Sequence, residues 1–522
     1  MGTLRIATEA ERSKTRLGAL CASVIAVLLA TMAHAQVRET ATVEVVEVPV
    51  YVTARNAPVG GLTRDNFQLF INGTPQAIDY FDVTDYATLT ESHDVRQRRL
   101  YMLVFDLLSP ANDLHHAQRA ALEFVDHALP SDTIGVATYN AGGLKIIVPF
   151  THDHAIADRA VAALAFPALN DPLHLTLSAA ERGEIGGGRF HDPRFDPALL
   201  DPRITLAALA DDEVASLTDL ADRLAGMEGQ KHVVLLSAGF EGVLLHGLES
   251  QRAPGDIRSM SLIPRETRGR LPMLNMDLVR HIEGLNRAFA AAGVFLDAID
   301  IGGLRPFQTF ADNESLYALV RDTGGEVIDH RNDLPSALRL LADTHRVVYN
   351  LGFSAHDTGR SENRITVRLV NVPRGTQALY RHSYTAGAGE GDTGDMLRLA
   401  DIIQNDIPQN GVTTNVIATS SGNAATVELE LPGRELLAHE VAGFIGAKVM
   451  MYVMSGASVV AFKIKRIDID VSRAEAGLQD GAPVRVSDTF DLPPGHYAAK
   501  VVVRMDATGA LGFARADVTV TP

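Results

Sequence analysis

The sequence predicts an α/β fold: a doubly wound, mostly parallel sheet with flanking all-β modules. Three observations support this fold class. The first is the uninterrupted apolar run 100–105, which suits a strand buried on both faces. The second is the alternation of strand-like and helix-like patterns between residues 97 and 345. The third is the return of β-branched, period-two segments on either side of that region. A chain of 522 residues is also too long for one core, so several domains are expected.

Residues 1–35 have the pattern of a secretory signal peptide. Four basic residues precede the apolar run Leu17 to Met32, which ends in Ala33-His34-Ala35 before Gln36. The uncharged run is shorter than the roughly 20 residues that a membrane span needs, which favours cleavage over an anchor. We therefore expect an exported protein, periplasmic or extracellular, with no stable membrane span after signal cleavage.

Composition excludes several classes of partner and site. The only cysteine, Cys21, lies in the signal segment, so the mature chain has no disulfide, no thiol nucleophile and no cysteine metal ligand. The net charge of −17 argues against nucleic acid as a partner. The charge is explained by solubility, and a protein partner remains the expectation.

Four segments outside the central region have their own patterns. Residues 36–96 predict an N-terminal β module, in which 67–71 alternates before the turn Asn72-Gly73. Residues 346–385 read as trailing strands that pack with this module. Residues 386–395 have a Gly-rich linker composition, and 396–522 predicts an all-β, immunoglobulin-like sandwich.

Within the central region 97–345, strands alternate with amphipathic helices. The predicted strands are 100–106, 134–139, 144–148, 233–237, 294–300 and 326–328, and the predicted helices are 113–129, 154–166, 212–226, 274–291, 313–323 and 334–345. Ser109-Pro110 or Asn112-Asp113 supplies the start of the first helix. Two longer interruptions, 166–210 and 240–270, are candidate functional loops. The first carries four Asp-Pro pairs and predicts an extended, turn-rich excursion.

Polar residues follow the predicted central strands where ligands bind in open parallel sheets, beyond the carboxyl ends. Asp106 ends the first strand and Asp300 ends a later one. The candidate binding face comprises Asp106, Ser109, Asn112, Ser237, Glu241 and Asp300. Helix capping, loop hydrogen bonds and solvated charge are the structural alternatives for these side chains.

Several pieces of the chain resemble bacterial exported proteins with a von Willebrand factor A-related domain. These pieces cover roughly residues 40–385. They are the Gly60-Gly61-Leu62-Thr63-Arg64-Asp65-Asn66-Phe67 segment with its Asn72-Gly73 turn, Leu103-Val104-Phe105-Asp106, Asp132-Thr133-Ile134-Gly135-Val136, the run from Gly229 to Ser237, Thr323-Gly324-Gly325 and Tyr349-Asn350-Leu351-Gly352-Phe353. The resemblance implies an interaction domain that recognises a protein partner through its top face. The final β region has only a loose similarity to immunoglobulin-like modules.

In the metal-competent branch of that family, an Asp-x-Ser-x-Ser loop, a Thr and an Asp-Gly hold a divalent cation, a chemistry suited to Mg²⁺. Here Asp106 fills the first position, but Leu108 and Pro110 replace the two hydroxyl residues, and Ala238 replaces the second Asp. We therefore expect a degenerate metal site and no cofactor. Mg²⁺ or Mn²⁺ on Asp106 and Ser109, in a rearranged site with Glu241 and Asp300, is the alternative.

Enzymatic patterns are incomplete. The segment from Leu236 to Gly239 lacks the first glycine of the nucleophile elbow G-x-S-x-G. His115-His116 and the pair His152 and His154 lack the spacing of H-E-x-x-H. The sequence thus predicts an exported, non-enzymatic interaction or adhesion protein. Metal-dependent adhesion and a secreted hydrolase are the alternatives.

Overall fold

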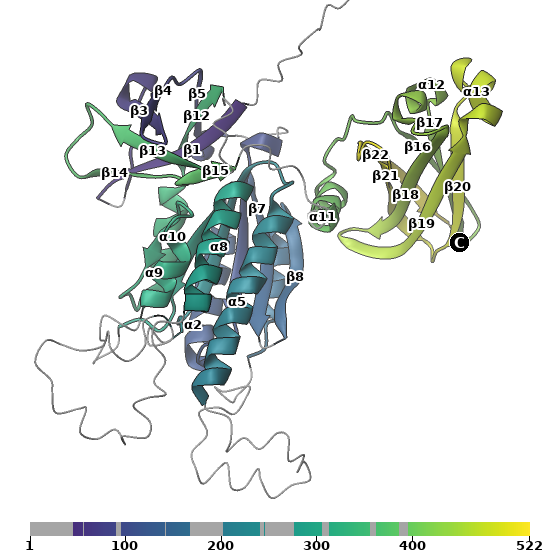
Figure 1. The fold of residues 1–522 in the computed structure, drawn as a ribbon. Coiled ribbons are helices and arrows are strands. Elements are labelled where there is room, and N and C mark those ends of the chain that lie inside the picture. The colour runs from purple at the N-terminus through teal and green to yellow at the C-terminus, as the bar shows by residue number, and fades with distance from the viewer. Residues whose placement is uncertain are drawn as a thin grey trace, which may run out of the picture. The chain divides into compact units, whose positions relative to one another are not determined.

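The computed structural model describes residues 45–55, 57–89, 95–140, 142–166, 202–240, 245, 276–304, 313–354, 362–385 and 395–521 (Figure 1). Its central sheet has six strands in the order β11-β10-β9-β6-β7-β8. All neighbours are parallel except β7 and β8. The bounds are β6 (Arg99–Asp106), β7 (Asp132–Asn140), β8 (Gly143–Thr151), β9 (Gln230–Ser237), β10 (Val294–Asp300) and β11 (Val327–Ile328).

The central strand β6 is buried along its whole length, which explains its continuous apolar run. Successive side chains of a strand point to opposite faces. Met102 and Val104 accordingly join one core, while Leu103 and Phe105 join the other. Helices α5 (Pro202–Leu224), α8 (Met276–Ala292) and α9 (Glu314–Val320) supply the first core, and α2 (Ala111–Asp126), α3 (His154–Ala162) and α10 (Leu334–Thr344) supply the second. The mixed α/β content and mostly parallel sheet agree with the predicted fold class.

Two helix starts differ from the sequence-based expectation. α5 begins at Pro202, inside the segment predicted to be an extended excursion up to residue 210. Proline fits the first helical turn because its missing N–H would have no partner there, so Pro202 can start a helix. α2 begins at Ala111 and has no side-chain cap, because its N-cap residue is Pro110, whose side chain cannot accept a hydrogen bond.

The strands before and after the α/β region pair with each other. One antiparallel sheet has the order β14-β1-β12-β5, with the short β2 beside β1, and a second has the order β15-β13-β3-β4. The bounds are β1 (Val45–Ala54), β2 (Ala57–Pro58), β3 (Phe67–Ile71), β4 (Thr74–Gln76), β5 (Tyr80–Asp85), β12 (Val347–Ser354), β13 (Glu362–Leu369), β14 (Thr376–Leu379) and β15 (Ser383–Thr385).

The C-terminal region contains two antiparallel sheets around one core, in the orders β16-β17-β20 and β19-β18-β21-β22. The bounds are β16 (Asn415–Ser421), β17 (Ala424–Leu431), β18 (Phe444–Ser455), β19 (Ser458–Asp470), β20 (Val484–Asp491), β21 (Gly495–Met505) and β22 (Leu511–Val520). These antiparallel sheets fit the all-β module predicted for this region. Helices α11 (Asp395–Asn405), α12 (Gly433–Leu436) and α13 (Val471–Gln479) lie in it as well.

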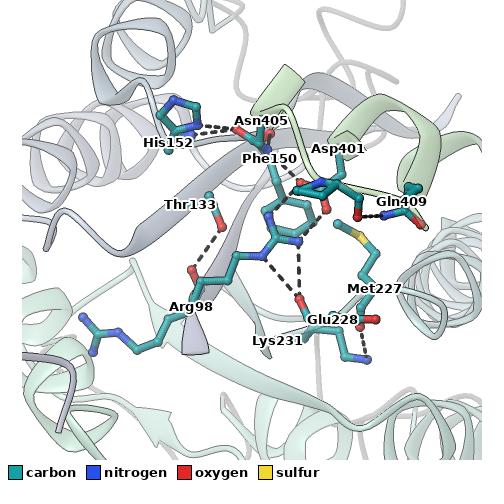
Figure 2. A network of polar contacts seen from close by, with 12 residues as sticks. Arg98, Thr133, Phe150, His152, Met227, Glu228, Lys231, Asp401, Asn405 and Gln409 are labelled. Carbon is teal, nitrogen blue, oxygen red and sulfur yellow. Dashed lines mark hydrogen bonds and ion pairs between the residues drawn. The ribbon is translucent and has the colours of Figure 1, made fainter. Parts of the chain in front are cut away.

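Helix α11 takes part in two hydrophobic cores and carries a buried ion pair. Leu397 joins the first core of the α/β region, whereas Ile402 joins a cluster with strand residues of the C-terminal region. The Asp401 carboxylate accepts hydrogen bonds from both terminal nitrogens of Arg98, at 3.0 and 2.5 Å. Figure 2 shows this network together with Asn405, whose amide donates to the Phe150 carbonyl at 2.9 Å. The amphipathic pattern of a helix explains how α11 serves both cores.

The expected signal peptide 1–35 lies outside the described residues, as do most of each long insertion and all of the expected linker 386–395 except Asp395, which begins α11. Among the helices that the structure describes, none is long and apolar enough to cross a membrane.

Candidate functional site at the carboxyl edge of the sheet

Asp106 is the last residue of β6 and lies at the carboxyl edge of the parallel sheet. Its side chain is buried, with 4% of the residue exposed. One carboxylate oxygen, Oδ1, accepts the backbone N–H of Leu108 at 3.0 Å. The other, Oδ2, accepts the hydroxyls of Ser109 at 2.9 Å and Ser237 at 2.6 Å. Both oxygens are therefore satisfied by protein donors.

The same two serines join the loops that follow β6 and β9. The Ser109 hydroxyl accepts the backbone N–H of Ala238 at 2.9 Å, and the Ser237 hydroxyl accepts that of Gly239 at 2.8 Å. Gly239 has φ +71°, and a Cβ there would lie 2.6 Å from the Ser315 hydroxyl. Glycine is needed because the left-handed region and this close approach both disfavour a side chain. Ala238-Gly239 is thus a tight connection at the sheet edge.

Two buried carboxyl groups influence each other near this edge. Burial raises the pKa of Asp106, and the hydrogen bonds from Ser237, Leu108 and Ser109 oppose that shift. Glu213 of α5 is only 5% exposed, and its Oε1 has no hydrogen-bond partner among the described residues. Burial and the charge of Asp106 together raise the pKa of Glu213 well above its usual value. Glu213 therefore favours the protonated form in the folded protein.

Asp300, at the end of β10, belongs to a different hydrogen-bond network. Its Oδ1 accepts the backbone N–H of Gly302 at 2.9 Å, and its Oδ2 accepts the side-chain amide of Asn313 at 3.0 Å. The same amide also approaches Asp329 at 3.3 Å, and the Tyr317 hydroxyl donates to Asp329 at 3.0 Å. Asp300 thus organises the start of α9.

The six residues of the predicted face fall into three groups. The structure brings Asp106, Ser109 and Ser237 together, as described above. Asp300 has other partners, and Asn112 is exposed in the first turn of α2. Glu241 lies outside the described residues. Sequence reasoning missed Glu213, although it sits in the apolar stripe of α5 that includes Ala210, Val214 and Leu217.

A Mg²⁺ or Mn²⁺ site would need several oxygen ligands that are free to turn towards the ion. The donors around Asp106 instead direct one N–H and two O–H groups at its carboxylate. In the part of the chain that the structure describes, Asp106 and Asp300 do not enter any group of three His, Cys, Asp or Glu side chains with metal-binding spacing. Because protein donors satisfy the Asp106 carboxylate, its surroundings do not fit the Mg²⁺ or Mn²⁺ ion of the alternative hypothesis.

No protein-family model matches the chain, and no curated protein matches it. Among solved structures, the conserved hypothetical protein BatB from Bacteroides thetaiotaomicron shares 10% identity, covers 47% of this chain and 98% of its own, and has a TM-score of 0.24. The VWA domain of SpRpn10 shares 9% identity, covers 46% and 94%, and has a TM-score of 0.23. Similarities of this size do not establish a shared fold, so function must be argued from the geometry of this chain.

Proposed function

We propose that this chain is an exported, non-enzymatic protein that recognises a protein partner through the carboxyl edge of its α/β sheet, without a metal ion. The recognising surface comprises the loops after Asp106, Ser237 and Asp300, together with the insertions 166–210 and 240–270. The observation that carries the proposal is the closed network around Asp106, in which three protein donors occupy the carboxylate. This network holds two loops in a fixed shape, as a preformed recognition surface requires.

Two alternatives have less support. Metal-dependent adhesion needs the Asp106 oxygens, which the serine hydroxyls already bind. A hydrolase needs an activated nucleophile beside a base. Ser237 is fully buried, and its hydroxyl donates to the Asp106 carboxylate rather than to an imidazole. A buried serine that anchors two loops is suited to structure more than to attack on a substrate.

The role of metal can be tested by thermal unfolding of the mature chain with and without millimolar Mg²⁺ or Mn²⁺. A ligand that binds only the native state raises its stability. We expect no rise in melting temperature. A rise that disappears in the Asp106→Ala variant would contradict the metal-free proposal and favour metal-dependent adhesion.

The recognising surface can be tested with a photo-crosslinking residue at position 112, which is exposed at the carboxyl edge. We expect it to capture a discrete protein species from extracts of the source cells. Leu304 follows β10 and is 59% exposed, so Leu304→Glu should weaken this capture. Tyr80 in β5 is 49% exposed and provides the matched Tyr80→Glu control. The proposal would be contradicted if Leu304→Glu and Tyr80→Glu weakened the capture equally. It would also be contradicted if a crosslinker at position 80 captured the same species as well as one at position 112.

Export can be tested separately by sequencing the N-terminus of the protein recovered from the source cells. We expect Gln36 to be the first residue and the protein to occur in the periplasmic or extracellular fraction. A chain that retains residues 1–35 in the cytoplasm would refute export, without bearing on the recognising surface.

A further inference from the structure

The amino-terminal half of the same sheet contains a second buried polar cluster. His232 is the third residue of β9, Asp297 is the fourth residue of β10, and His345 directly follows α10. All three are at most 1% exposed. The His232 and Asp297 side chains lie on the sheet face that also carries Val234 and Ile299. Residues far apart in sequence thus meet inside the protein.

The donor atoms of the three side chains converge on one small volume. One nitrogen or oxygen of each lies within 4.8 Å of the others. His232 Nδ1 lies 3.4 Å from Asp297 Oδ2, and His345 Nε2 lies 3.7 Å from Asp297 Oδ1. Ligands about 2.0–2.2 Å from a tetrahedral zinc ion are separated by roughly 3.3–3.6 Å. Each imidazole faces a different oxygen of one carboxylate; the 3.4 Å spacing falls in this range and the 3.7 Å spacing lies just above it.

His345 supplies an independent observation that points to a ligand. Neither of its ring nitrogens has a hydrogen-bond partner among the described residues, although the residue is 1% exposed. Leaving a buried polar group without a partner is unfavourable. An imidazole whose Nε2 already faces a carboxylate at 3.7 Å would be satisfied by a shared cation.

Asp297 is a fully buried carboxylate whose negative charge a cation would offset. Arg99 is the nearby positive side chain, but both oxygens of Asp132 bind it at 2.8 and 2.9 Å. Asp297 therefore has no dedicated countercharge from Arg99.

Neighbouring groups orient the three side chains. The Tyr51 hydroxyl lies 2.9 Å from His232 Nε2, which leaves Nδ1 as the atom facing Asp297. The backbone N–H of Glu326 donates to Asp297 Oδ1 at 3.0 Å. Gly325 permits that contact, because a Cβ there would lie 2.0 Å from the Leu296 carbonyl oxygen. Such outer contacts are typical of metal ligands.

We propose that His232, Asp297 and His345 bind a divalent transition-metal ion of the zinc type, which fastens β9 and β10 to the segment after α10. Two imidazoles and one carboxylate supply three of the four positions of a tetrahedral zinc ion, and a water molecule would fill the fourth. The competing arrangement is a pair of neutral imidazoles held by stacking, since the two rings lie 3.9 Å apart at 25°. Metal binding requires these rings to tilt so that both nitrogens point at the ion. The proposed role is structural and independent of the recognising surface.

The test is the metal content of the full chain, expressed in zinc-supplemented medium and purified without a metal-affinity tag. We expect elemental analysis to find close to one zinc ion per chain, and His345→Phe and Asp297→Asn to lose it. His127→Ala is the matched control, because that side chain is 58% exposed. The melting temperature should fall by several degrees in His345→Phe. If His345 were only an unpaired buried imidazole, the same variant would melt at the same or a higher temperature.

A measurement on the unchanged chain covers the case in which the variants fail to fold. Protein expressed with Co²⁺ should show intense visible absorption bands, and X-ray absorption should show nitrogen and oxygen ligands without sulfur, since the single cysteine is Cys21. A wild-type chain that retains neither Zn²⁺ nor Co²⁺ would overturn the proposal. The Mg²⁺ and Mn²⁺ test with Asp106→Ala probes the carboxyl edge of the sheet, so its outcome does not bear on the zinc proposal.

Discussion

Two buried aspartates on the central sheet, Asp106 and Asp297, are satisfied in different ways. Asp106 receives two hydroxyls and one backbone N–H, all within 3.0 Å. Asp297 receives one backbone N–H at 3.0 Å and faces two imidazoles at 3.4 and 3.7 Å. The first carboxylate is closed by the protein, whereas the second leaves His345 without a partner.

The comparison shows that a position at the end of a strand does not by itself make a carboxylate available to a ligand. Asp106 stands at the strand end where ligands bind in open sheets, yet its neighbours occupy its acceptor sites. Asp297 stands inside a strand, yet it faces two imidazoles, the ligand type of the proposed zinc site. The bonds around a carboxylate, rather than its place in the topology, decide what it can bind.

The largest expected effect concerns Arg99, which neutralises Asp132 near the Asp297 cluster. Arg99→Met should destabilise the chain by about 3–5 kcal/mol, because it leaves a buried carboxylate without its cation. Both side chains are 2% exposed, so water cannot replace the bond. Urea unfolding measures the loss, and Arg99→Met with Asp132→Leu should recover much of it. Arg223→Met, at a side chain 43% exposed, is the control and should change little.

The next largest loss of stability is expected at the hydrogen-bond network of Asp106. Asp106→Ala should destabilise the chain by about 2–3 kcal/mol, because the Ser109 and Ser237 hydroxyls and the Leu108 N–H lose an acceptor. Asp126→Ala removes the same group from a side chain 84% exposed and should cost little. Equal denaturation midpoints for the two variants would show that the network around Asp106 does not stabilise the fold.

A smaller, pH-dependent effect should come from Glu213. Its pKa is raised in the folded state, so the unfolded state loses its proton first as pH rises above the usual value of 4.5. The contribution to stability therefore falls with rising pH until the folded pKa is passed. Glu213→Gln should melt like the wild type near pH 4 and a few degrees higher near pH 8, at about 2–4 °C per kcal/mol. Thermal unfolding across this range measures the difference, and a constant offset would contradict the assignment.

The smallest effect should come from the exposed ion pair between Asp85 and Arg346. The guanidinium holds the pKa of the Asp85 carboxyl below its usual value, and the side chains are 29% and 45% exposed. Asp85→Asn should lower the free energy of unfolding by less than about 1 kcal/mol, and this loss should be smaller at high salt. Urea unfolding at low and high ionic strength checks this. A loss as large as that of Arg99→Met would break the distinction between buried and exposed pairs.

Much of the central sheet could be read from periodicity. The apolar run before Asp106 predicted a buried strand, and β6 is buried throughout. The sequence predicts that helix α5 begins at residue 212, ten residues after its observed start, because the Asp-Pro pair at 201–202 favours a turn. The C-terminal helices were missed, since strand-rich surroundings outweighed the short amphipathic segment 395–405.

The candidate sites were predictable to different degrees. Asp106, Ser109 and Ser237 were named from strand ends, and parallel strands bring those ends to one edge. His232 and Asp297 are 65 residues apart, and neither ends its strand. His345 comes from yet another segment. No short motif connects these three residues, so nothing in the sequence marked them as a cluster.

The sequence by itself determined the order of strands and helices in the α/β region, because hydrophobic periodicity and turn residues act locally. It also placed Asp106 at a strand end, since the polar residue follows an apolar run. Only the tertiary structure decided which donors satisfy that carboxylate and which buried side chains meet His345. These outcomes depend on strand register and on contacts between distant segments, which local patterns do not specify.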